Sequence, residues 1–195
     1  MALARGFKAE AERIVQELRR ELGAPIDKSL DPYQIAEHLG IEVVPADELV
    51  SKESLKQLAS LQPGAFSACT FKPSQDRTII VYNPLHSAAR RKSDIAHELA
   101  HIILDHALTR LERVSSVIFF VCDARQEEEA GWFSGCLLLP RMLLLSSLRR
   151  GLSPAEIAKR HEVSEPMVVY RINVTGIRRQ LESGAPAKGV IVGSG

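Results

Sequence analysis

Apolar residues recur every three to four positions near the start of the chain. Ile14, Leu18 and Leu22 fall on one face of residues 9–22, among glutamates and arginines. This period is typical of an amphipathic surface helix. A second helix is predicted over residues 31–40, because an Asp-Pro pair at its start supplies a capping side chain and a proline suited to the first turn.

The next part of the chain has β-branched residues in short runs. Residues 41–45 indicate a short strand, and residues 46–62 a partly polar helical stretch. Two further strand candidates, residues 65–71 and 78–82, flank a Lys-Pro-Ser-Gln-Asp segment with the chemistry of a turn. Together these two candidates predict a β-hairpin.

Longer apolar runs follow the hairpin. Residues 87–106 and 124–139 are predicted helices, and Pro140 is compatible with the end of the second. Residues 107–123 between them have no clear pattern. These elements predict an α+β fold, in which a small antiparallel sheet packs on a helical core.

The C-terminal part of the chain has the signature of two capped helices. Ser153, followed by a proline and by Glu156, matches a capping box with proline in the first turn. A turn at residues 162–164 leads to a second predicted helix over residues 167–181. Residues 153–181 therefore resemble a helix-turn-helix unit, which could bind DNA or could simply pack on the core.

Composition and charge narrow the classes of function. Of the 195 residues, 45% are apolar and 25% are charged, which are ordinary values for a globular protein. The net charge of +1 gives no strong electrostatic reason to expect nucleic-acid binding, since such binders usually have a strongly basic face or domain. Although residues 153–181 include Arg171 and Arg178, we favour a packing role for them over direct DNA binding.

Cysteines and apolar runs indicate the compartment. Cys69, Cys122 and Cys136 are an odd number without C-x-x-C spacing, so a disulfide framework is not expected. No stretch approaches the roughly 20 apolar residues that span a bilayer. The N-terminus also lacks the apolar region of a signal peptide. We therefore expect a cytoplasmic protein without a membrane anchor.

The strongest chemical signal is H-E-x-x-H, formed by His97, Glu98 and His101 within the predicted helix 87–106. Residues four apart lie one turn apart on the same helix face, so both imidazoles can reach one metal ion. Glu98 lies around the helix, where it can act on a metal-bound water without binding the metal. The neighbouring residues are apolar, and unpaired imidazoles would be costly to bury among them. The motif predicts a zinc site with Glu98 as general base.

A catalytic zinc site needs a third protein ligand. Three adjacent glutamates, Glu127, Glu128 and Glu129, open the predicted helix 124–139 just downstream of the motif. A helix packed beside the first could bring one of these carboxylates to the metal. Spacing alone does not choose among the three, and a solvated helix face is the alternative.

Three polar residues near the motif are expected to stay outside the site. Asp94, Asp105 and His106 do not continue the row of ligands along the helix, so we predict an exposed polar role for each. Tyr82 and Tyr170 could hydrogen-bond a reaction intermediate, but the sequence places neither of them near the metal.

The two motifs together resemble the ImmA/IrrE family of metallo-endopeptidases. The second motif of that family is similar to E-x-E-A-N-x-F-A-x-x-L-L-x-P, and residues 127–140 here are EEEAGWFSGCLLLP. When Phe133 and Pro140 are aligned, the ligand glutamate of the family falls on Glu127. Gly131 stands where the family usually has asparagine, whose side chain could orient a ligand.

The resemblance covers roughly residues 31–181, and a change of character from residue 152 onward predicts a division of the chain. Residues 1–145 are expected to form a zincin-like metallopeptidase domain. Residues 146–182 are expected to form a C-terminal helical subdomain, and residues 183–195, rich in glycine and alanine, a flexible tail.

The resemblance also implies a function. Zinc would be held by His97, His101 and Glu127, and manganese or iron would suit the same ligands. The expected activity is site-specific cleavage of a helix-turn-helix repressor, which derepresses stress or mobile-element genes. The alternatives are a DNA- or protein-binding regulator, or an antitoxin-like partner, with a structural or vestigial metal site. Glu98 favours the enzyme, because a structural site needs no general base.

Overall fold

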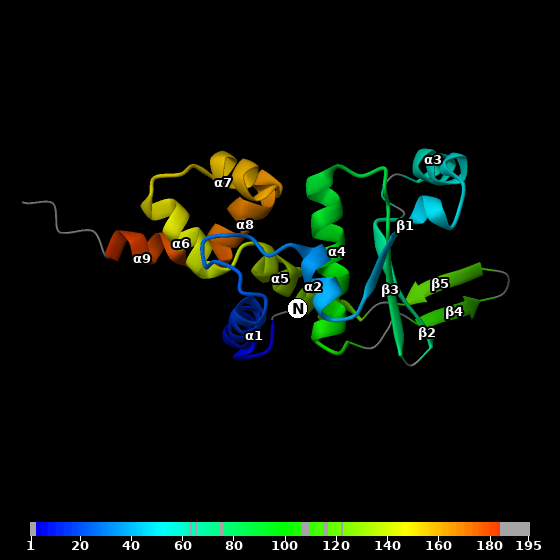
Figure 1. The fold of residues 1–195 in the computed structure, drawn as a ribbon, viewed down its shortest axis with the longest axis horizontal. Helices are drawn as coiled ribbons and strands as arrows, with labels where there is room; N and C mark the ends of the chain where they lie inside the picture. Colours follow the sequence, from blue (N-terminus) through cyan, green and yellow to red (C-terminus); the bar gives the residue numbers. More distant parts are fainter. Residues whose placement is uncertain are drawn as a thin grey trace, which may run out of the picture.

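The computed structural model describes residues 3–62, 64, 66–74, 76–106, 110–114, 117–121 and 123–183. Strands occur in the first two thirds of the chain, and the described C-terminal third is helical (Figure 1). The elements are α1 (Phe7–Glu21), α2 (Pro32–His38), β1 (Glu42–Pro45), η1 (Ala46–Glu48), α3 (Lys52–Leu61), β2 (Ala68–Ser74), β3 (Arg77–Tyr82), α4 (Ala88–Ile103), β4 (Arg110–Val114), β5 (Val117–Val121), α5 (Ala124–Leu138), α6 (Arg141–Arg149), α7 (Pro154–His161), α8 (Glu165–Thr175) and α9 (Ile177–Ser183).

Several helices begin at the capping residues that the sequence indicates. Asp31 accepts a hydrogen bond from the backbone N–H of Tyr33 at the start of α2, with Pro32 in the first turn. Ser153 and Glu156 form the predicted capping box at the start of α7. These starts are set locally, because a capping side chain satisfies backbone N–H groups that have no partner within the helix.

Three strands form a mixed sheet in the order β1-β3-β2. β2 pairs antiparallel with β3, with Cys69 opposite Val81, which confirms the predicted hairpin and the α+β class. β1 pairs parallel with β3, with Val43 opposite Ile80, so the antiparallel prediction is wrong for this strand. The reason is topological: the chain crosses from one edge of the sheet to the other between β1 and β2, and β3 then returns in the direction of β1.

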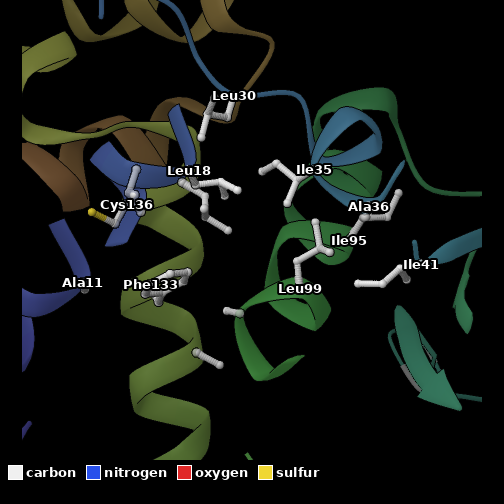
Figure 2. Packing of buried hydrophobic residues seen from close by; sticks show 14 of the residues in the cluster. Ala11, Leu18, Leu30, Ile35, Ala36, Ile41, Ile95, Leu99, Phe133 and Cys136 are labelled. Atoms are coloured by element: carbon white, nitrogen blue, oxygen red, sulfur yellow. The ribbon is translucent and has the colours of Figure 1, made fainter. Parts of the chain in front are cut away.

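The first hydrophobic core lies between α1, α2, α4 and α5 (Figure 2). Ile95 and Leu99 project from α4 into this core, where Ile35 of α2, Phe133 of α5 and Leu18 of α1 are also buried. Full burial of one such side chain contributes about 1.5–3 kcal/mol. This core therefore fixes α4 against α5, the two helices that carry the predicted motifs.

A second hydrophobic core joins the end of α5 to the C-terminal helices. α6, in a stretch to which the sequence pattern assigns no element, buries Leu143 and Leu144. α8 contributes Val168 and Ile172, and α4 contributes Ala96. The C-terminal helices thus share a core with α4. The boundary proposed at residue 145 falls within α6 and stays a prediction.

The predicted helix over residues 167–181 is two helices. α8 ends at Thr175, and Gly176 follows with a φ of 66°. Glycine adopts this left-handed conformation without the steric cost that a side chain brings, so it stops the helix and lets α9 start in another direction. Of the proposed tail, residues 184–195 lie outside the described residues.

Two described strands lie in the stretch for which the sequence pattern predicts no element. β4 and β5 pair antiparallel, with Glu112 opposite Phe119 in the backbone register. They form a separate two-stranded sheet.

Within the ranges that the structure describes, no single helix is both long and apolar enough to cross a membrane. α5 and α6 reach that length and composition only as a pair bent by 47°, and both helices contribute side chains to the hydrophobic cores.

Candidate metal centre

Helix α4 carries the H-E-x-x-H motif and is buried along one side. Ser87 caps its start, and the fully buried Ile95 and Leu99 anchor it in the first core. His97 and His101 are half-buried, and their rings lie 4.9 Å apart between centroids. The apolar side of α4 thus fixes the rotation of the helix that presents both imidazoles.

Three side chains from α4 and α5 meet. Nε2 of His97 lies 3.2 Å from Oε2 of Glu127, and Nε2 of His101 lies 3.4 Å from Oε1 of the same carboxylate. The two Nε2 atoms are 3.2 Å apart. Asp123 caps α5, which puts Glu127 in the first turn of that helix. In the described part of the chain, these three residues form the one group of side chains able to hold a metal ion.

The spacing of this group suits a tetrahedral metal ion. Zinc held at about 2.0–2.1 Å by nitrogen and oxygen places neighbouring ligand atoms about 3.3 Å apart. The three separations, between 3.2 and 3.4 Å, lie close to that value. Two imidazoles and one carboxylate are also a donor set that zinc accepts, with one position left for water. Of the three adjacent glutamates, the structure brings Glu127 to the histidines.

Burial keeps His101 in the protonation state that a metal requires. Desolvation, with a smaller contribution from the nearby His97, lowers the pKa of His101 to about 4, although Glu127 opposes the shift. A metal binds the neutral imidazole. His101 is therefore neutral near pH 7 without any help from a metal.

Glu98 contacts β2 rather than the group of three. Its Oε2 accepts a hydrogen bond of 2.6 Å from Oγ1 of Thr70. Burial raises the pKa of Glu98, whereas the Thr70 hydrogen bond and His97 lower it. Sequence reasoning missed Thr70. The sequence alone held no signal for it, because the reason for its role appears only in the register: Thr70 pairs with the fully buried Ile80, and a polar side chain beside such a position needs a partner.

Two of the three flanking polar residues have partners inside the protein. Nδ1 of His86 lies 2.6 Å from Oδ2 of Asp94, and both side chains are mostly buried. His106 is also buried and contacts His101. The predicted exposed role is therefore wrong for Asp94 and His106, because the segments at the two ends of α4 fold back onto the helix and bring the ring of His86 to Asp94 and the ring of His106 to His101. It is correct for Asp105.

Comparisons with known proteins bear on the family and the fold. A family model described as IrrE N-terminal-like domain, peptidase M78, matches residues 36–173. A Mycobacterium tuberculosis transcriptional regulator has a similar structure, with a TM-score of 0.50 and 18% identity over 88% of this chain and 48% of that one. This chain spans about half the length of that protein, and at this identity the likeness concerns the fold alone. No curated protein matches the sequence.

Proposed function

The chain belongs to the IrrE N-terminal-like domain family, which is of the metallopeptidase type, and we propose that it is a metal-dependent endopeptidase. The observation that carries the proposal is the convergence of His97, His101 and Glu127 at separations suited to one metal ion. We expect zinc, and manganese or iron would suit the same ligands.

The proposed ligands have complementary roles. His97 and His101 would hold the metal through neutral Nε2 atoms, and Glu127 through its carboxylate, which offsets part of the metal charge. Bound zinc would supply Lewis acidity toward a peptide carbonyl and acidity to a water molecule. The residues themselves fix where that chemistry takes place, because α4 and α5 share a packed core.

We assign the proton transfers to Glu98. Thr70 donates to Oε2, which leaves the other carboxylate oxygen to take a proton from water and return it to the leaving amine. Because burial raises the pKa of Glu98, the carboxylate is a stronger base near neutral pH than an exposed one. Thr70 positions this carboxylate by holding one of its two oxygens.

A protease-like domain implies a protein substrate. We propose a helix-turn-helix repressor, cleaved at one site to derepress stress or mobile-element genes, as the resemblance to the ImmA/IrrE metallo-endopeptidases implies. Such a substrate acts in the cytoplasm, the compartment expected for this chain.

In this proposal α7 and α8 pack on the core and do not bind DNA. Arg171, one of the cations that the DNA-binding alternative needs, is fully buried. The exposed residues of α8 include none of its cations; they are Glu165, Pro166, Tyr170 and Asn173. DNA binding draws on lysines and arginines that reach phosphates. A sequence-selective, nanomolar mobility shift at physiological salt, abolished by Arg178→Ala, would favour the regulator instead.

The test of the enzyme is Glu98→Gln, which keeps the shape of the side chain but cannot accept a proton. Wild type and variant are incubated with candidate repressors of the same genome, and mass spectrometry records any single new terminus. We expect cleavage to fall by about 10²–10⁴-fold in the variant. Metal content should stay at one equivalent, because Glu98 is not among the proposed ligands.

Glu53→Gln on α3 is the matched control, since Glu53 is exposed and the substitution makes the same change in charge. It should cleave like wild type. Equal cleavage by the Glu98→Gln variant would remove Glu98 from the mechanism. A metal-free wild type would remove the site altogether.

A further inference from the structure

His106 is folded back onto the proposed metal site by the end of α4. α4 ends at Ile103, and Asp105 has a φ of 51°, in the left-handed region that residues other than glycine rarely adopt. The backbone N–H of His106 then donates to the carbonyl of His101, at 2.9 Å. The rings of these two histidines meet edge to face, with centroids 5.0 Å apart.

A chain of polar contacts runs outward from His101. Nδ1 of His106 lies 3.0 Å from Nδ1 of His101, and Nε2 of His106 lies 3.3 Å from Oε2 of Glu129. The other oxygen of Glu129 accepts from Nε of Arg125, at 2.9 Å. The side chains of His106 and Glu129 are only 6% and 12% exposed. Two buried polar groups thus connect a proposed ligand to an arginine at the start of α5.

Only one arrangement of protons satisfies these contacts in the proposed site. If Nε2 of His101 binds a metal, its Nδ1 carries the hydrogen and donates to Nδ1 of His106. His106 must then carry its own hydrogen on Nε2, which faces the carboxylate of Glu129. The opposite tautomer of His106 would bring two N–H groups together. The Glu129 carboxylate therefore selects the tautomer of His106, and His106 selects that of His101.

We propose that His106 and Glu129 are positioning residues that fix the tautomer and ring orientation of His101 and thereby raise the affinity of the site for zinc. The inference rests on the proposed function, since it assumes that His101 binds a metal. Partners of this kind behind a metal-binding histidine commonly change metal affinity by about 10–100-fold. It also gives separate roles to two of the three adjacent glutamates: Glu127 faces the metal and Glu129 supports a ligand.

The test measures zinc affinity directly, by competition with a chromophoric chelator. His106→Leu removes both ring nitrogens and should weaken zinc binding by about 10–100-fold. His106→Gln offers an oxygen toward His101 and an amide N–H toward Glu129, so it should recover part of the loss. Glu129→Gln should weaken binding less than His106→Leu. In the cobalt-substituted protein, the visible spectrum should shift in His106→Leu, because the ring of His101 is free to turn.

His86→Leu is the matched control. His86 is likewise a buried histidine paired with a carboxylate of α4, Asp94, but it touches none of the proposed ligands. It should leave zinc affinity and the cobalt spectrum unchanged, whatever it does to thermal stability.

The possible results distinguish failure of the positioning role of His106 and Glu129 from failure of the proposed metal site. A wild type that binds no zinc overturns both. Tight zinc binding by wild type and by His106→Leu alike overturns the positioning role and leaves the proposed site standing. Equal weakening by His86→Leu would make the effect one of general stability, and loss as complete as in His101→Ala would make His106 a ligand. Either result also overturns the positioning role.

Discussion

The two ends of α5 both hold charged groups, partly exposed at the start and fully buried at the end, with opposite consequences. Near its start, Glu127 faces the Nε2 atoms of two histidines at 3.2 and 3.4 Å. Near its end, Gly135 packs against Arg171, which donates to the Leu139 carbonyl at 3.1 Å and to Glu12 at 3.0 Å. At the first end, three atoms that can each bind a metal ion face one another. At the second end, a guanidinium faces oxygen atoms that accept its hydrogen bonds.

The start of α5 is therefore a candidate binding site, whereas its end is a packing contact between helices. The guanidinium of Arg171 lies 4.7 Å from the Trp132 ring centroid and links α8 to α1 and to the end of α5, which stabilises the packing of the C-terminal helices. Three metal-binding atoms that face one another gain little from the protein alone, and burying them costs free energy unless a ligand joins them. Substitutions at the two ends should therefore separate metal binding from stability.

The largest effect is expected at the start of α5. Glu127→Ala removes a proposed ligand and should lower zinc affinity by more than the 10–100-fold typical of a ligand's supporting partner. Glu128→Ala, one residue along, should leave the metal in place. Elemental analysis of gently purified protein measures both, with His97→Ala and His101→Ala as references. Loss of metal in Glu128→Ala, with retention in Glu127→Ala, would reverse the assignment.

At the other end, Arg171→Met should cost stability and leave the metal. The substitution removes the donor to the Leu139 carbonyl and to Oε1 of Glu12, whose Oε2 still accepts from the backbone N–H of Arg141. Because a buried carboxylate then loses its charged partner, the free energy of unfolding should fall by about 3–5 kcal/mol. Arg178→Met on α9 changes an exposed arginine and should stay within about 0.5 kcal/mol. Denaturant unfolding measures both. An unchanged free energy of unfolding in Arg171→Met would mean that the contacts of Arg171 contribute nothing to stability.

Acid should lower the free energy of unfolding of the metal-free protein through His101. The pKa of His101 is about 4 in the fold, below its ordinary value of about 6.5, so the unfolded chain takes up the proton first. The contribution of His101 to stability is therefore full above pH 6.5 and is lost as the pH falls toward 4, by about 1–3 kcal/mol.

Unfolding of chelator-treated protein across that pH range measures the loss. His101→Gln should flatten the dependence. His161, whose pKa is also lowered by burial, contributes with the same sign and remains in both proteins. Identical pH profiles for wild type and variant would contradict the shift.

The smallest effects compare two glycines on α5. A Cβ at Gly135 would lie 2.8 Å from Cδ of Arg171, so Gly135→Ala should destabilise the protein by about 1–3 kcal/mol. Gly131 has no heavy atom within 4 Å of such a Cβ, and Gly131→Ala should stabilise the helix by about 0.5–1 kcal/mol. Thermal melts of the two variants should move in opposite directions. A rise in the melting temperature of both variants would show that helix propensity, and not the close approach of Arg171, governs both positions.

Local patterns in the sequence determined the elements that carry the site. The spacing of His97 and His101, with the apolar Ile95 and Leu99 between and beside them, predicted a half-buried helix with both imidazoles on one face, because helical periodicity is a local property. The capping box at Ser153 was equally local. The run of three glutamates was not enough to select a ligand, and the choice of Glu127 came from the resemblance to a known family.

Only the tertiary structure decided which groups meet across elements. Glu98 accepts a hydrogen bond from Thr70 on β2, and His106 contacts Glu129. Arg171 donates to the carboxylate of Glu12, 159 residues away in the chain. The parallel direction of β1 has the same origin. None of these contacts appears as a periodic pattern in the sequence. Each depends on how whole helices and strands bury their apolar faces against one another. That packing decides which polar side chains come close enough to form hydrogen bonds with each other.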